Sequence, residues 1–546
     1  MSHINGLPPN VLAQILFKAA LPLAGELDDW KAKLPLLAVC RAWTKLAETF
    51  VLNQVFVKVS EACTNYDPPI EDLTHSAHVA WTSNAELIIS RNCMLNAKQM
   101  TIEMPHSFTC DHLRHVVLGI LKLDCVGWPR INTLSIIDPP LYCGHFIEPV
   151  AIDEQTVADV ERTMQYFGQN MGCIAELNLS RRTNKCVGGL VHTSLASVYG
   201  GQLQALRVGA PVLFDFSHYF RNIAVLELTL SLEVARAVPS VCGGTLKVLK
   251  LRDVPRDFVW RHFHYDFYVR PIVFRRLTIL HLFYDDKYPL PTAAEIQSKV
   301  ASGALNCDQL AFPALKQLFI RNCTPDCDLL YAEEPFPELR RVHLSGSLDE
   351  ISHCSRLKLA WVRDLHIKLD LDETEEAVQI CNATNHFFSQ ICIGRTAILE
   401  IGVGHLTLDP ELIRWIDLTK LELVSINYKT LCKLIARLPN LTKFEAYSLE
   451  FGADTVESLA ADESLFASAD PLLAWGARLA TVTVNTLDWV CPLVINAYGI
   501  QAFILHAGAL TSLTVPEPVE SRLRAFINAF KDSHPHLANI EVDINF

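Results

Sequence analysis

The sequence predicts an α/β fold in which a short strand and a partly helical segment alternate many times along the chain. A short apolar phrase, leucine-x-x-leucine-x-leucine with other aliphatic residues allowed as anchors, recurs from about residue 131 to the C-terminus. Its last two anchors alternate with more polar residues, which is typical of a strand with one buried face. Amphipathic stretches at helical spacing lie between the phrases, for example from Val519 to Lys531.

The phrase recurs in fifteen copies, with steps of 20 to 43 residues between first anchors and most steps in the twenties. The first anchors lie at residues 131, 174, 203, 223, 246, 277, 315, 339, 362, 396, 418, 441, 479, 510 and 537. A single strand and helix cannot bury their apolar face, whereas stacked neighbours can. The copies therefore predict a solenoid with its strands on the concave face. In spacing they resemble irregular leucine-rich repeats: Cys323 stands where the consensus has Asn or Cys, although most copies lack the Asn.

Composition supports a long repeat array and argues against a nucleic-acid-binding protein. At 546 residues the chain is too long for one simple core, and its mean hydropathy of +0.20 fits an array that buries an anchor set in every repeat. The formal net charge of −13 argues against a nucleic-acid partner, which needs a basic surface. Seventeen scattered cysteines are expected to be free thiols in a reducing compartment.

The chain is expected to work in the cytoplasm, the nucleus or both, and not to be secreted. No basic residue precedes Lys18, as a secretory signal would require. Residues 489–516 contain no Asp, Glu, Lys or Arg, but Pro492, Asn496 and His506 interrupt this window. We expect a buried part of the array there, and no membrane span.

The first sixty residues do not follow the repeat phrase and instead predict two or three short helices. Leu7 and Pro8 open the stretch, and apolar pairs at Val11 and Ile15 continue it at helical spacing. The segment closes on Val39-Cys40-Arg41-x-Trp43. These residues resemble an F-box, with Asn10 standing where an acidic residue is usual and a longer segment between the helices.

The resemblance implies that this module docks on the Skp adaptor of a cullin-RING ubiquitin ligase while the repeats hold a protein substrate. The residues implied to bind the adaptor are Leu7, Pro8, Val11, Leu12, Ile15, Leu16, Leu36, Val39, Cys40 and Trp43. The alternative is that these helices only cap the first repeat, since the ends of a solenoid need covering. In that case Leu12, Ile15, Val39 and Trp43 would be buried in the first repeat and not partly exposed.

The sequence divides into an F-box-like module at residues 1–60, a turn-rich connector at 61–77 and the repeat array at 78–546. Clear repeats begin at 131. Ala97, Met100 and Ile102 form an earlier, weaker copy, and a helix is expected from Asp111 to Leu123.

No catalytic, metal or cofactor site is predicted. The candidate metal-binding pairs are His75 with His78, His112 with His115, His262 with His264, and Cys323 with Cys327. None is joined by a second pair at zinc-ligand spacing. The glycine pairs at 188–189 and 402–404 lack the lysine of a phosphate-binding loop. We therefore expect a non-catalytic protein without a cofactor; an enzyme embedded in the array is a third and weaker hypothesis.

The outward strand positions between residues 246 and 368 predict a basic and aromatic patch on the concave face. The candidate substrate-binding residues are Lys250, Arg252, His281, Phe283, Phe319, Arg321, Arg341, His343, His366 and Lys368. In an acidic protein this patch suggests an acidic or phosphorylated protein substrate, with Arg252, Arg321 and Arg341 as anion contacts. The alternative is that these cations only keep an exposed strand face soluble. The following copies carry Glu400, then Lys420 with Glu422 and Lys443 with Glu445.

Overall fold

A computed structural model describes part of the chain, in two compact units. The described residues are 11, 14, 37, 44, 45, 48, 52–60, 80–104, 108–137, 152–180, 187–209, 221–229, 244–254, 272–285, 310–322, 338–347, 351, 362–369, 393–401, 415–427, 431, 434, 435, 437–450, 478–487, 500, 501, 504 and 508–545. The N-terminal unit spans Met1–Arg252 and the C-terminal unit spans Asp253–Phe546.

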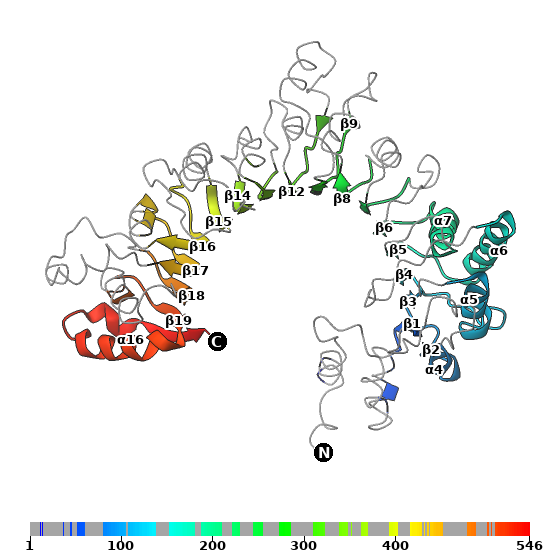
Figure 1. Ribbon diagram of the computed structural model, residues 1–546, viewed down its shortest axis with the longest axis horizontal. Helices are drawn as coiled ribbons and strands as arrows, with labels where there is room; N and C mark the ends of the chain where they lie inside the picture. The colour runs from blue at the N-terminus through cyan, green and yellow to red at the C-terminus, as the bar shows by residue number, and fades with distance from the viewer. Residues whose placement is uncertain are drawn as a thin grey trace, which may run out of the picture. The chain divides into compact units, whose positions relative to one another are not determined.

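The N-terminal unit contains a sheet of neighbouring strands (Figure 1). Its strands are β1 (Gln54–Ser60), β2 (Ala80–Ser83), β3 (Gln99–Glu103), β4 (Thr133–Ile137), β5 (Glu176–Leu179), β6 (Ala205–Val208), β7 (Val225–Thr229) and β8 (Val248–Val254), within which the boundary between the units falls. From β1 through β3 to β8 each strand pairs in parallel with the next, while β2 runs antiparallel to β1. Parallel neighbours require a crossover connection, which explains the long steps between copies.

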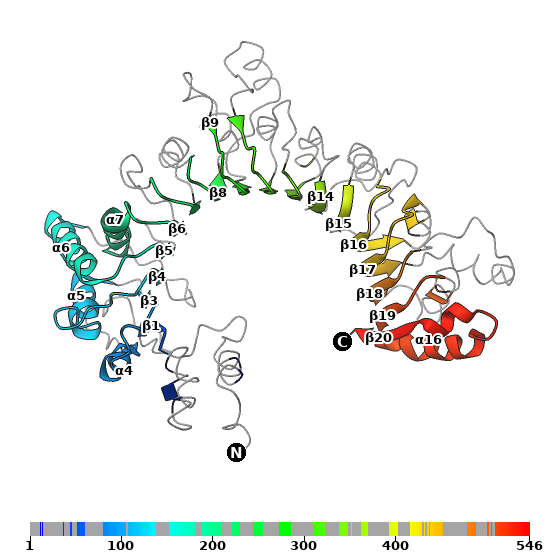
Figure 2. The same ribbon diagram turned by 180° about the vertical axis from the view of Figure 1, so that it is seen from behind.

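Helices lie along one side of this sheet, as seen from both directions in Figures 1 and 2. They are α4 (Ala85–Ser90), α5 (Cys110–Arg114) with the π-helical turn η4 (His115–Ile120), α6 (Glu154–Asn170) and α7 (Val187–Tyr199). The Asp153 carboxylate accepts a hydrogen bond from Thr156 N at 2.8 Å and caps α6. The α5 and η4 turns together confirm the helix expected from Asp111 to Leu123.

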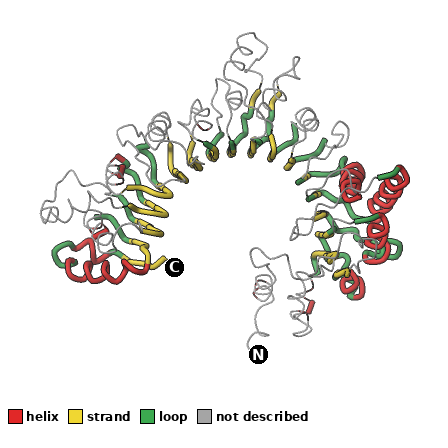
Figure 3. Tube along the Cα trace, viewed as in Figure 1, coloured by secondary structure: helices red, strands yellow, loops and turns green. Residues whose placement is uncertain are grey.

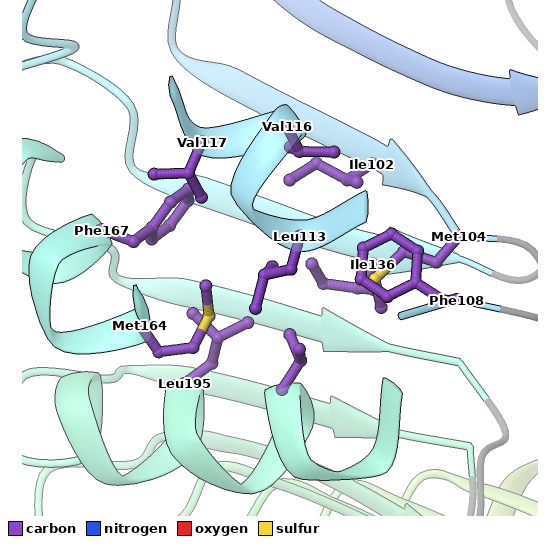
Figure 4. A pocket seen from close by; sticks show the side chains of 11 residues that line it. Ile102, Met104, Phe108, Leu113, Val116, Val117, Ile136, Met164, Phe167 and Leu195 are labelled. Carbon is purple, nitrogen blue, oxygen red and sulfur yellow. The ribbon is translucent and has the colours of Figure 1, made fainter. Parts of the chain in front are cut away.

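The core of the N-terminal unit lies between these helices and strands β3 and β4 (Figure 4). Leu113, Met164 and Leu195 converge there with Ile102 and Ile136, and every side chain that lines the gap between them is apolar. The gap is about 10 Å³, at the lower limit of what one water molecule occupies. It is therefore a packing defect of the core and not a ligand pocket.

The C-terminal unit repeats the parallel arrangement with fewer described helices (Figure 3). Its elements are β9 (Ile272–Val273), β10 (Ile279–Tyr284), β11 (Leu310–Ala311), β12 (Gln317–Arg321), β13 (Arg341–Gly346), β14 (Val362–Leu369), β15 (Ile393–Ile401), β16 (Lys420–Asn427), β17 (Lys443–Glu450), β18 (Thr481–Leu487), β19 (Ser512–Pro516), α16 (Glu517–Phe530), the 3-10 turn η11 (Pro535–Asn539) and β20 (Glu541–Asn545). Parallel pairing runs from β10 through β12 to β20, and β9 pairs separately with β11. Both units are thus α/β repeats of parallel strands, as predicted.

The predicted anchors form the buried face of these strands. Leu249, Leu280 and Leu421 are fully buried, and Leu318 and Val342 are at most 2% exposed. The positions between these anchors carry partly exposed side chains, so buried and partly exposed residues alternate, for example in β10 and β12. This period-two pattern confirms that the phrase encodes a strand whose apolar side faces the core.

A backbone pattern at the second position of the phrase links successive repeats. The Asn132 carbonyl accepts hydrogen bonds from two consecutive amides of the next repeat, Ala175 N at 2.8 Å and Glu176 N at 2.9 Å. In the C-terminal unit, the Arg340 carbonyl likewise accepts hydrogen bonds from Arg363 N at 2.9 Å and Asp364 N at 2.8 Å. In several repeats a threonine side chain makes a further bond of this kind; for example, the Thr442 hydroxyl donates to the Thr419 carbonyl at 2.9 Å. These bonds pair backbone groups at the start of each strand with those of the preceding repeat, so that these groups are not left unsatisfied.

The repeat frame of β15 differs from the one read in the sequence. Thr396, taken as a first anchor, is partly exposed, and in this strand Ala397 and Leu399 are the buried residues. The parallel register with β14, which pairs Leu365 with Ala397, shifts this copy two residues toward the N-terminus. The sequence pattern took Thr396, Leu399 and Ile401 as the anchors, because Ala397 is smaller than the aliphatic residues that usually fill an anchor position.

An additional copy of the phrase precedes all those recognised in the sequence. Leu52, Val55 and Val57 are completely buried, and β1 pairs with β3 in the same register as later neighbours. This strand lies inside the range that was assigned to the F-box-like module. Ala97, Met100 and Ile102 are likewise buried, so the weak copy at β3 is a true repeat strand.

Candidate protein-binding surface

The partly exposed side of the strands in the C-terminal unit carries a continuous row of aromatic rings. Strand register aligns His281 of β10, Phe319 of β12, His343 of β13 and His366 of β14 side by side. Phe283 adds a fifth ring, two residues beyond His281. We call these five residues the ring row.

Successive rings of the ring row are in contact. The ring centroids of His281 and Phe319 lie 5.1 Å apart, those of Phe319 and His343 4.1 Å, and those of His343 and His366 3.9 Å. Phe283 lies 5.0 Å from Phe319. Cross-strand aromatic pairs stabilise a sheet and also present a broad apolar surface. The predicted aromatic residues of the patch are therefore brought together.

Most cations of the predicted patch already have acidic partners. Arg341 Nε lies 3.2 Å from Asp364 Oδ2, and Lys368 Nζ lies 3.6 Å from Glu400 Oε2. The other Glu400 oxygen lies 2.9 Å from His366 Nε2. Because Glu400 belongs to the next copy of the phrase, it was not counted as part of the basic window, and the window seemed more basic than the folded surface is.

Lys250 and Arg252 lie in the N-terminal unit, where Glu227 pairs with both. Lys250 Nζ is 3.6 Å from Glu227 Oε2, and Arg252 Nη2 is 3.1 Å from Glu227 Oε1. Arg207, which is aligned with Glu227 on the neighbouring strand, donates a 3.0 Å hydrogen bond to the Asn178 side chain. An anionic ligand at Arg252 would therefore have to compete with the Glu227 carboxylate.

Arg321 differs from the other predicted anion contacts. Its side chain is exposed, and it makes no ion pair with any residue in the described part of the chain. On one neighbouring strand Arg321 is aligned with Phe283, and on the other with Ser345, which is only 4% exposed. Lys368 follows Ser345 in the same register row. Two cations therefore flank a short side chain, directly beside the ring row.

His343 is uncharged at neutral pH. Its partial burial, followed by the proximity of His366, lowers its pKa from 6.5 to about 4, although Glu400 acts in the opposite direction. His281 and Lys368 add to the lowering. The centre of the ring row is consequently an uncharged aromatic ring and not a cation.

Of the residues implied to bind the adaptor, only Val11 is described. It is helical and 36% exposed, and Gln14 of the same stretch is also exposed. The rest lie outside the described residues: Leu7, Pro8, Leu12, Ile15, Leu16, Leu36, Val39, Cys40 and Trp43. Further along, Leu37 is buried, and its carbonyl accepts a 2.8 Å hydrogen bond from the Thr44 hydroxyl.

Of the four candidate metal pairs, only His112 with His115 lies among the described residues. No group of three His, Cys, Asp or Glu side chains in the described ranges is arranged to hold a metal ion. His112 instead completes the capping box of α5 with Thr109. The pairs at 75 and 78, 262 and 264, and 323 and 327 lie outside those ranges. Within the same ranges, no helix is long and apolar enough to cross a membrane.

Comparisons with known proteins leave the family open. No protein-family model and no curated protein matches the chain. Among solved structures, the chain is similar to a leucine-rich-repeat protein of Leptospira interrogans, with 12% identity, a TM-score of 0.27, and coverage of 83% of this chain and 90% of that chain. It is also similar to the complex of Rad7 and Elc1 from yeast, with 12% identity, a TM-score of 0.27, and coverage of 74% and 83%. At this level of similarity, the fold assignment depends on the strand register and buried anchors described above.

Proposed function

We propose that the protein is a non-catalytic substrate receptor of a cullin-RING ubiquitin ligase. In this proposal residues 7–46 dock on a Skp-type adaptor, and the strand side of the C-terminal unit holds a protein target. The ring row is the observation that carries the target-binding half. Five partly exposed rings, each in contact with its neighbour on adjacent strands, form an aromatic surface beside charged residues, and aromatic residues are enriched at the centre of protein interfaces.

The adaptor-binding half is supported by the F-box resemblance and by the exposure of Val11. An apolar side chain that is 36% exposed on a helix is suited to a partner groove. The module also joins the array without a long spacer: the Leu52 amide donates to the Glu48 carbonyl at 3.1 Å, and Arg91 of the first repeats lies 3.2 Å from the Glu48 carboxylate. These contacts support a firm connection between the adaptor-binding module and the repeats.

The test is co-purification of the full chain with a Skp adaptor, beside a Val11→Glu, Leu12→Glu double variant. A matched control is Leu118→Glu, because Leu118 is an apolar residue of comparable exposure, 41%, on η4. We expect the wild type and the control to bind and the double variant to lose the adaptor. Circular dichroism of all three proteins checks that the fold is retained.

If the wild type is folded and does not bind the adaptor, the receptor proposal is wrong. The chain would then be a leucine-rich-repeat scaffold whose N-terminal helices only cap the array. Loss of binding in the Leu118→Glu control as well would show that the double variant reports on general surface charge and not on docking.

A further inference from the structure

The strand side of the C-terminal unit changes character abruptly at β15. Up to β14, the register row through the middle of the strands carries His281, Phe319, His343 and His366; beyond it the row continues with Ile398 and Glu422. On β16 and β17 each lysine is paired with a glutamate of its own strand, as in Lys443 and Glu445 at 3.5 Å. The contiguous ring row is therefore confined to four adjacent strands. The strands after it present paired charges, and β17 also carries a further exposed ring, Tyr447, which is 58% exposed.

The charges around the ring row leave one net positive group. Arg341 is balanced by Asp364, and Lys368 is balanced by Glu400, whose other oxygen lies 2.9 Å from His366 Nε2. Arg321 has no such partner in the described residues. The charge of a paired cation is already compensated by a carboxylate of the protein, which also repels an incoming anion. Arg321 can contact an anion without competing with such a carboxylate.

We propose that this surface binds an extended segment of a partner protein that carries an aromatic side chain and an anionic group two residues apart. The aromatic side chain packs on the ring row at Phe319 and His343, and the anion contacts Arg321. This inference rests on the proposed target-binding role of the same surface and narrows the predicted acidic substrate to one with an aromatic anchor and a single anion.

The spacing follows from the strand geometry. Phe319 and Arg321 lie two residues apart on β12, on the same side of the sheet. Two residues along a strand advance about 6.6 Å, and side chains two apart in an extended ligand are separated by the same distance on one side of its backbone. An aromatic residue and an acidic residue in adjacent positions would point to opposite sides and could not engage both contacts.

Carboxylate and phosphate share the chemistry that a guanidinium recognises. An aspartate or glutamate and a phosphorylated serine are therefore two sources of the anion. The neutral state of His343 favours a single anion near Arg321 over a strongly acidic run, because the ring row itself adds no charge at its centre.

The test measures binding of short fluorescent peptides to the full chain by fluorescence polarisation. The peptides have a Gly/Ser background and contain Trp and Asp two residues apart, in either order. Parallel peptides replace Trp with Ala, Asp with Asn, or Asp with phosphoserine, and one set places Trp and Asp in adjacent positions. We expect replacement of Trp to weaken binding about tenfold, as for an aromatic anchor, and replacement of Asp by Asn to weaken it about three- to tenfold.

Two protein variants and a matched control locate the contacts. Phe319→Leu removes the ring but keeps an apolar side chain, and Arg321→Gln removes the unpaired charge. Lys443→Gln is the control, because Lys443 is a cation on the same side of the sheet that already pairs with Glu445. The Arg321→Gln protein should no longer distinguish Asp from Asn, while Lys443→Gln should bind like the wild type.

Several results would overturn the inference. These are absence of binding by any peptide, equal binding of Trp and Ala peptides, and an Arg321→Gln protein that still prefers Asp. Phosphoserine binding more tightly than Asp would identify phosphate as the preferred anion. If the chain co-purifies with the adaptor but binds no peptide, the receptor proposal stands and the aromatic-anchor site is wrong. If it binds the peptides but not the adaptor, the peptide site stands and the receptor proposal is wrong.

Discussion

The His343 and His366 rings are in contact across β13 and β14 in a tilted arrangement, with centroids 3.9 Å apart and planes inclined by 36°. Partial burial disfavours a charge on His343, and two imidazolium ions at this separation would also repel each other. Its pKa is accordingly lowered to about 4. A residue that the sequence places among basic neighbours is therefore part of an uncharged ring surface.

Stability should fall as the pH is lowered from about 6.5 to about 4. The unfolded chain binds a proton on His343 near the ordinary pKa of 6.5, while the folded chain does so only near 4. Within this window the unfolded state holds more protons at this position, so acid favours unfolding. Urea unfolding of the wild type and of His343→Gln at pH 7.5 and at pH 5, each measured by circular dichroism, checks this.

The loss of stability between the two pH values should be smaller in His343→Gln than in the wild type. The other titrating groups are common to both proteins, so the difference between the two losses reports on His343 and on its interaction with His366 and Glu400. Equal losses would mean that His343 titrates normally in the folded protein.

Gly172 should tolerate no side chain. A Cβ atom at this position would lie 2.5 Å from the Pro129 carbonyl oxygen and 2.9 Å from that of Ile131, and both are backbone atoms that cannot rotate away. We expect Gly172→Ala to cost roughly 1–3 kcal/mol. The control is Gly201→Ala, because a Cβ there meets nothing within 4 Å. Thermal unfolding midpoints should show a clear decrease for the first variant and almost none for the second.

Asn84 should be essential for the first repeat. It is buried, its side chain accepts a hydrogen bond from Phe56 N at 2.7 Å, and its amide donates to the Gln54 carbonyl at 2.8 Å. Asn84→Ala would leave both backbone groups of β1 without these partners, at a cost of about 2 kcal/mol. Amide hydrogen exchange at Phe56 should accelerate in this variant and remain unchanged in Gln99→Ala, which alters an exposed side chain of β3. Unchanged exchange in both would contradict the linking role of Asn84.

The register of β15 can be tested with two neighbouring substitutions. Ala397 is fully buried, so Ala397→Gln would force a longer polar side chain into the core and should cost roughly 2 kcal/mol or more. Thr396→Gln affects a partly exposed position and should remain within about 0.5 kcal/mol of the wild type. Urea unfolding midpoints decide between the frames, since the frame read from the leucine pattern predicts the opposite order.

Sequence periodicity located most strands because leucine anchors at fixed spacing leave a repeat with only one way to bury its apolar side. Anchors such as Leu280, Leu318 and Leu421 needed no further information. The pattern failed where the anchors are small or atypical. Ala397 resembles a spacer, and Leu52 with Val55 follows the phrase inside a segment that had been assigned to another module.

By itself, the sequence determined the repeat architecture, the outward positions of the strands and the aromatic residues that occupy them, because alternation along a strand is a local property. Only the tertiary structure decided how these positions combine across strands. Register places Glu400 beside Lys368 and His366, pairs Asp364 with Arg341, and leaves Arg321 without a partner in the described residues. Ion pairing and ring stacking depend on contacts between residues more than twenty positions apart, which no local pattern specifies.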